Sequence, residues 1–296
     1  MAGAALAMLL ESGIDEQLAR HVAHLFTRDP LVIRKDRLHL DDDAETDHWE
    51  NLQSTNWQTV RWKPPPKKAS ACGPHVGWRV EFRSMEVQPT DFENAAFTVL
   101  IVLASRVILA FDLNLYMPLS LVDENMRRAH LLNATTTQKF WFRALEGPSE
   151  GEVMEMTISE IICGKEDCFP GLVPLILSYL DEISCDPETL ALVTNYMELI
   201  LRRARGELLT PAAWMRAFVA DHPDYQHDSI VPESVAHDLL HAVAALAEGR
   251  RQEPSLLGLR HIPLLRTDNA WPKPLTAPRL SRDVLARYRA RLSDTH

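Results

Sequence analysis

The chain has 296 residues, of which 46% are hydrophobic and 24% are charged, proportions ordinary for soluble globular proteins and sufficient for one large domain or two small ones. Its formal net charge of −10 at pH 7 argues against a nucleic-acid-binding protein, because binding to a phosphate backbone requires clustered lysine and arginine. Cys72, Cys163, Cys168 and Cys185 are too few and too irregularly spaced for a disulfide framework or a paired zinc motif, so we expect reduced thiols, with a regulatory disulfide as the alternative.

Residues 3 to 27 have the spacing of an amphipathic helix with a break or bend near Gly13. The same stretch lacks the charged region that opens a secretory signal, and it turns polar quickly. The most apolar run further on, Ala95 to Ala104, is interrupted by Arg106 well before the ~20 residues needed to cross a bilayer. We therefore expect a cytoplasmic protein without a membrane span.

Two segments alternate between apolar and charged residues, as strands with one buried face do. In residues 58 to 63, Val60 and Trp62 share one face, and the opposite face carries Arg61 and Lys63. From residue 78 onward, the apolar positions are Trp78, Val80 and Phe82, and the charged positions are Arg79, Glu81 and Arg83. The two segments flank a loop rich in turn-forming residues, which predicts an antiparallel pair with its charges on one surface. By pattern alone, these charges could simply form cross-strand salt bridges on an exposed sheet.

The alternation changes phase after Arg83, which predicts either a β-bulge near Arg83 and Ser84 or a change of strand partner there. Pro89 should end the strand, and Thr90 to Glu93 has the pattern of a capping box. The helix that follows, Asp91 to about Ala110, is apolar on all sides, so we expect it to be buried nearly all round.

The rest of the chain is predominantly helical in pattern. The expected helices are 120–132, 157–162, 172–183, 187–205, 211–220 and 232–248, with an exposed loop at 146–151. Residues 279 to 292 have the pattern of a basic, weakly amphipathic terminal helix within a variable tail, 261–296. The predicted class is α+β, with short antiparallel strands and a largely helical remainder.

Several long strings resemble a known family in the family's own order. They are GWRVEFRSMEVQPTDFEN from Gly77, STNWQTVRWKPPP from Ser54, PLSLVDENM from Pro118, GKEDCFPGLVPLILSYL from Gly164 and GELLTPAAWMRAFVADHPDYQHDS from Gly206. Together they resemble the catalytic subunit of eukaryotic glutamate–cysteine ligase, which catalyses the first step of glutathione synthesis. The resemblance assigns residues 1–260 to the second half of the ligase catalytic domain and implies that the first half is missing.

The resemblance implies a glutamine-synthetase-like fold and an ATP- and Mg²⁺-dependent reaction. In this reaction, the γ-carboxylate of L-glutamate is phosphorylated, and the amine of L-cysteine then displaces phosphate to give γ-glutamylcysteine. The EFR motif places a metal-binding glutamate at Glu81 and a phosphate-binding arginine at Arg83. Arg79 on the same face is a weaker cofactor-binding candidate, and Arg61 and Lys63 are weaker still.

Two functional classes stay open at this point. The first is an ATP-dependent ligase, or a part of one that is inactive alone, with glutamate, cysteine and ATP as substrates. Its partners would be a modifier subunit or the missing first half. The second is a non-catalytic interaction protein derived from the ligase's second half.

Overall fold

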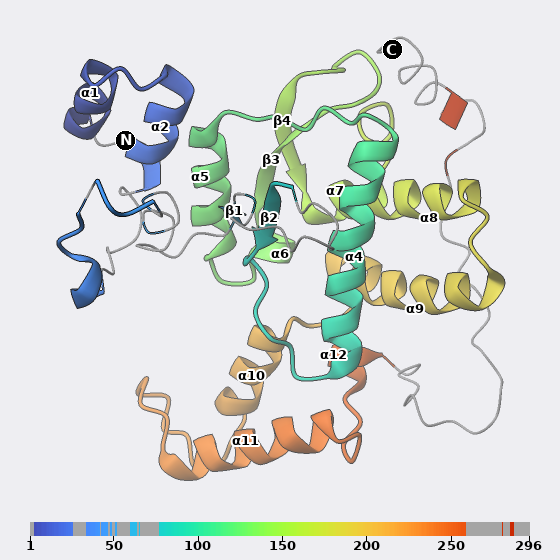
Figure 1. Cartoon of the computed structure of the whole chain (residues 1–296). Coiled ribbons are helices and arrows are strands. Elements are labelled where there is room, and N and C mark those ends of the chain that lie inside the picture. The colour runs from blue at the N-terminus through green and yellow to red at the C-terminus, as the bar shows by residue number, and fades with distance from the viewer. Residues whose placement is uncertain are drawn as a thin grey trace, which may run out of the picture. The chain divides into compact units, whose positions relative to one another are not determined.

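The computed structural model describes residues 3–25, 34–41, 43–46, 48, 51, 60–63, 65, 77–258, 280 and 285–286. The chain divides into two compact units, residues 1–86 and 87–296. Both units contain a pair of antiparallel strands, and helices predominate in the second (Figure 1). The described residues therefore agree with the predicted α+β class.

The first unit combines a helix pair with a two-stranded ribbon. Its elements are α1 (Gly3–Glu11), α2 (Glu16–Leu25), the 3-10 turn η1 (Lys35–Arg37), β1 (Val60–Lys63) and β2 (Arg79–Phe82). The predicted break between the first two helices is confirmed at Gly13, whose φ of +83° is readily adopted by glycine alone. Residues 26–33, 58–59 and 66–76, which include predicted helix and strand ends and Cys72, lie outside the described residues.

The strand prediction was wrong beyond Phe82. β2 ends there, so the described residues contain neither a bulge at Arg83 and Ser84 nor a strand that continues to Pro89. A strand persists only while a neighbouring strand accepts its hydrogen bonds, and Phe82 lies opposite Val60, the first residue of β1. The phase slip in the sequence therefore marks the end of pairing.

The second unit contains nine helices and a β-hairpin among its described residues. They are α4 (Asp91–Ala110), α5 (Leu119–Ala129), α6 (Ala134–Thr137), β3 (Lys139–Arg143), β4 (Val153–Thr157), α7 (Ile158–Cys163), α8 (Leu172–Glu182), α9 (Pro187–Ala204), α10 (Pro211–Ala220), α11 (Glu233–Ala247) and α12 (Pro254–Leu257). The predicted helices match these closely. The hairpin of β3 and β4 was not predicted, because consecutive aromatic residues in Phe140–Trp141–Phe142 obscure the alternation.

The main core of the second unit forms where α4 packs against α8 and α9, with α7 and the hairpin beside them (Figure 1). A smaller cluster around Trp214 and Leu246 joins α10, α11 and α12. Gly171 permits the close turn into α8, since a Cβ atom there would lie 2.6 Å from the carbonyl carbon of Cys163. Of the predicted terminal helix, only residues 280, 285 and 286 are described. Leu280 and Leu285 pack against the main core.

The prediction that the helix after Pro89 is buried all round was wrong. α4 buries Ala96, Leu100 and Val107 against its neighbours, whereas Val102 and Leu109 on other sides are exposed. By length and composition alone α4 could span a bilayer, but core helices of globular domains pass the same test, and α4 packs against α8 and α9. Because α8 and α9 cover only part of the circumference of α4, the apolar side chains on its other sides stay exposed.

The described cysteines are free thiols. Cys163, Cys168 and Cys185 form no disulfide, as expected for reduced cysteines. Burial raises the pKa of the Cys168 and Cys185 thiols, which lowers the fraction present as reactive thiolate.

Candidate functional site

The pairing of β1 with β2 gathers the predicted charged residues on one face of the ribbon. Arg61 lies directly opposite Glu81, and Lys63 lies directly opposite Arg79. Residues that face each other across an antiparallel pair project from the same side of the sheet. The sequence-predicted surface therefore exists, and its centre is the one carboxylate in the set, Glu81.

Glu81 is held between two cations. Arg83 Nε donates a hydrogen bond of 3.0 Å to Glu81 Oε1, and the Lys63 ammonium contacts Glu81 Oε2. The Arg83 side chain is only 10% exposed, whereas those of Glu81 and Lys63 are both 35% exposed. The arginine is thus mostly covered, and the Glu81 side chain is partly exposed, although its Oε2 atom, which contacts Lys63, is covered.

The two cations also set the charge state of Glu81. The hydrogen bond from Lys63, followed by that from Arg83, lowers the pKa of Glu81 to about 2. Glu81 is consequently an anion at every pH near neutrality, and an ionised carboxylate is the hard oxygen ligand that Mg²⁺ prefers. The surrounding guanidinium and ammonium groups suit phosphate oxygens.

This arrangement fits one part of a nucleotide and metal site. Among the described residues of this ribbon face, four are cationic and one is a carboxylate, a composition that favours a polyphosphate ligand. Within the described ranges, no group of three or more His, Cys, Asp or Glu side chains is placed to hold a metal ion. Glu81 could therefore supply one ligand, and further carboxylates would have to come from elsewhere.

The structure changes the order of the cationic candidates. Lys63, ranked lowest with Arg61 from the sequence, contacts Glu81 directly. Arg79 is exposed and lies opposite Lys63, one position further along the ribbon. Lys63 is the diagonal neighbour of Glu81, two positions from the directly opposite Arg61, and its long side chain spans this distance.

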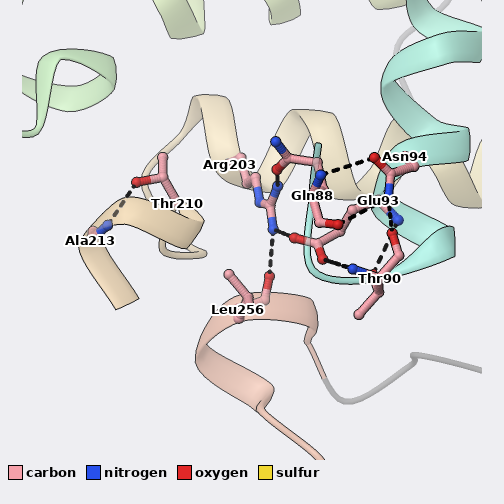
Figure 2. A network of polar contacts seen from close by, with 8 residues as sticks. All are labelled: Gln88, Thr90, Glu93, Asn94, Arg203, Thr210, Ala213 and Leu256. Carbon is pink, nitrogen blue, oxygen red and sulfur yellow. Dashed lines mark hydrogen bonds and ion pairs between the residues drawn. The ribbon is translucent and has the colours of Figure 1, made fainter. Parts of the chain in front are cut away.

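Sequence reasoning missed a second polar network, which lies inside the second unit. Glu93, at 0% exposure, caps α4 by accepting hydrogen bonds from Thr90 N at 3.1 Å and Thr90 Oγ1 at 2.7 Å. Its other oxygen, Oε1, accepts from Arg203 Nη2 near the end of α9. Figure 2 shows the guanidinium of Arg203 between Glu93, Gln88 and Leu256.

Arg203 connects three segments that are far apart in the sequence. Besides the bond to Glu93, it donates to Leu256 O at 3.3 Å and to Gln88 Oε1 at 3.4 Å. Asn94 in turn holds the backbone of Gln88. Its Oδ1 accepts from the Gln88 backbone N–H at 2.9 Å, and its Nδ2 donates to the Gln88 backbone carbonyl at 3.0 Å (Figure 2). The capping box signalled Glu93, but no local pattern signals its partner 110 residues away.

The second unit also has a shallow hollow on its surface. Its empty volume is about 270 Å³ including space open to solvent, and its lining includes Phe92, Glu198 and Arg202. Ligand pockets usually enclose about 300 to 1,000 Å³. The charged ribbon face is the better candidate site, because it combines a partly exposed carboxylate with cations of the kind that suit phosphate oxygens.

Comparison with known proteins identifies the family. A sequence model described as glutamate-cysteine ligase matches residues 1–246. The chain is 47% identical over 268 residues to the glutamate–cysteine ligase catalytic subunit of Mus musculus, a match that covers 84% of this chain and 41% of the mouse protein. The Homo sapiens catalytic subunit is 46% identical over 268 residues, with the same shares covered.

A more distant organism shows the same relation. The glutamate–cysteine ligase of Schizosaccharomyces pombe is 46% identical over 258 residues, covering 84% of this chain and 38% of the yeast protein. The chain thus spans about two fifths of the length of these relatives. Since the family model matches most of the chain, this protein belongs to the glutamate–cysteine ligase family.

Proposed function

We propose that this chain supplies the phosphate-binding strand and one metal ligand of an ATP-dependent ligase that joins L-glutamate to L-cysteine. The observation that carries the proposal is the ionised carboxylate of Glu81 held between Lys63 and Arg83 on an accessible face. The named activity of the relatives supports the reaction class. We also propose a cytoplasmic location and a glutamine-synthetase-like sheet of which β1 and β2 are two strands.

The reaction needs control of negative charge at each step. A γ-carboxylate oxygen of glutamate attacks the γ-phosphorus of ATP, the bond to the β-phosphate oxygen breaks, and ADP leaves. The cysteine amine then attacks the resulting acyl phosphate, phosphate leaves with the bonding electrons, and the amine loses a proton as the amide forms. Arg83 and Lys63 would bind phosphate oxygens and offset the charge that builds on them.

Glu81 would hold Mg²⁺ together with phosphate oxygens. The chemistry that Mg²⁺ would supply there is partial neutralisation of the negative charge of the phosphate groups. Mg²⁺ needs near-octahedral oxygen coordination, and the described part of the chain offers one carboxylate at this position. We therefore propose that the remaining carboxylates come from the part of the family's polypeptide that has no match here, and that the chain alone does not form γ-glutamylcysteine.

The test places Glu81→Gln in this chain co-expressed with the unmatched portion of the mouse catalytic subunit. ATP- and Mg²⁺-dependent phosphate release with glutamate and cysteine should fall at least about 100-fold, because glutamine keeps the shape but loses the charge. Arg83→Lys should also reduce release, since lysine cannot make a bidentate phosphate contact. Circular dichroism should show that both variants are folded.

Glu155→Gln is the matched control. Glu155 is also a strand glutamate paired with an arginine, Arg128, and its side chain is 40% exposed. Its substitution should leave phosphate release within about threefold of wild type, since Glu155 belongs to the β3–β4 hairpin and is not a residue of the charged ribbon face. Wild-type release by Glu81→Gln would remove Glu81 from the site, and robust release by the 296-residue chain alone would contradict the proposed dependence on the rest of the family's polypeptide.

A second function is supported by two observations. The described ribbon offers one carboxylate, Glu81, and the chain spans about two fifths of the length of its relatives. The chain could act as a non-catalytic partner of a ligase subunit, the modifier subunit or another catalytic chain. Binding to a complete mouse catalytic subunit, with no release of phosphate attributable to Glu81, would favour this function. Release that depends on Glu81 would exclude it.

A further inference from the structure

The β1–β2 ribbon has an unusual distribution of exposure between its two faces. The charged face is partly covered, with Arg61, Lys63, Glu81 and Arg83 of intermediate burial and Arg79 exposed. On the opposite face, Val60 is 42%, Val80 53% and Phe82 50% exposed. Trp78, just before β2, continues this surface at 55% exposure. We call Val60, Trp78, Val80 and Phe82 the apolar ribbon face.

An exposed apolar face on a ribbon of this size indicates that a further element packs on it. A two-stranded ribbon is at best marginally stable in water, and three or more strands or a packed element are usually needed. Among the described residues, no further strand pairs with β1 or β2. Clustered apolar side chains at a surface typically mark a site of protein association.

The occupant of this face can be inferred from the length of the relatives. More than half of the mouse, human and fission yeast polypeptides lies outside their match to this chain. We propose that the apolar ribbon face is the docking surface for that unmatched portion of the ligase polypeptide. This proposal rests on the proposed function, and it adds which surface receives the portion that would complete the site.

The division of the ribbon into two faces supports this occupant. A partner on the apolar face leaves the opposite face, with Glu81 and Arg83, open to a polyphosphate. A second copy of this chain is a poorer occupant, because each copy has a formal net charge of −10 and the two would repel each other.

The experiment co-expresses the affinity-tagged 296-residue chain with the unmatched portion of the mouse catalytic subunit. The test variant carries Val80→Lys and Phe82→Lys, which place charge on the apolar ribbon face. The control variant carries Ile230→Lys and Leu240→Lys, at residues of the second unit that are 68% and 69% exposed. Wild type and control should retain the mouse portion near one to one, and the test variant should retain at least tenfold less.

Hydroxyl-radical footprinting of wild type provides a measurement that needs no variant. Trp78 and Phe82 should become at least threefold less reactive in the complex than in the chain alone, while Leu240 should not change. Full retention by the folded test variant, no retention by wild type, or unchanged reactivity of Trp78 and Phe82 would overturn the proposal. Self-association of wild type that the test variant abolishes would also overturn it, in favour of a second copy.

Docking and catalysis are measured separately, docking by retention and footprinting and catalysis by phosphate release. A complex that protects the apolar ribbon face but releases no phosphate would contradict the proposed function and leave the docking surface supported. Phosphate release from a complex in which this face stays reactive would support the proposed function and contradict the docking surface.

Discussion

Two glutamates of this chain are paired with arginine in opposite ways. Glu93 is fully buried, and its carboxylate accepts from the cap residue Thr90 and from Arg203 within the second unit. Glu81 keeps 35% of its side chain exposed and is paired with Lys63 and Arg83 on a ribbon that bears further cations. The first pair joins three segments of one core, and the second leaves charge at the surface.

The difference separates a structural carboxylate from one that can bind a ligand. A buried ion pair has no alternative partner, so removing one member leaves an uncompensated charge in a low-dielectric interior. A half-exposed carboxylate can exchange a cationic side chain for water or a metal ion at little cost. Four substitutions or titrations test how far this contrast holds.

The largest expected effect is that of Arg203→Met. Loss of the guanidinium leaves Glu93 buried without its cationic partner, which should lower the free energy of unfolding of the second unit by about 3 to 5 kcal/mol. Urea unfolding followed by circular dichroism measures it. The paired variant Arg203→Met with Glu93→Leu should recover most of the loss, whereas a loss under about 1 kcal/mol in the single variant would show that Glu93 finds another partner.

Thr90→Ala should have an intermediate effect. The substitution removes the hydroxyl that accepts from Glu93 N and donates to Glu93 Oε2, at a cost of about 0.5 to 2 kcal/mol in unfolding free energy. Thr90→Ser, which keeps the hydroxyl, is the control in the same urea titration and should lie close to wild type. Equal losses in both variants would mean that the methyl group, rather than the cap, is what matters.

Glu81→Gln should change stability least, even though it removes a carboxylate with two cationic partners. Partly exposed ion pairs contribute about 0 to 1 kcal/mol, so the urea midpoint should stay near that of wild type. Lys63→Met is the companion variant and should behave alike. A loss above about 2 kcal/mol from either variant would show that the pairing of Glu81 is structural, like that of Glu93 with Arg203. Such a result would contradict its assignment to a binding site.

The last expected effect appears only in acid. Because the pKa of Glu81 is lowered from 4.5 to about 2 in the folded protein, its contribution is complete above pH 4.5 and is lost as the pH falls toward 2. The carboxyl carbon resonance of Glu81, assigned by comparison with Glu81→Gln, should titrate below pH 4.5, with a shift reduced by solvent screening of the partly exposed side chain. In Lys63→Met the midpoint should move upward, and a midpoint near 4.5 in wild type would contradict the pairing.

Local sequence patterns predicted much of the fold because they reflect local physics. The capping box at Thr90 and Glu93, the proline after the cap at Thr210 and the break at Gly13 each depend on residues a few positions apart. The β3–β4 hairpin was missed because its aromatic run lacks alternation, so its strand character comes from pairing with the partner strand.

The sequence by itself indicated most of the longer helices, the charged face of the ribbon and, through long matching strings, the resemblance to the ligase family. Tertiary structure alone decided that Lys63 contacts Glu81, that Arg203 pairs with Glu93 across 110 residues, and that α4 leaves one side uncovered. Caps, turns and alternation are fixed by neighbours in the chain, whereas register, buried charge pairing and exposure depend on which distant segments meet in space.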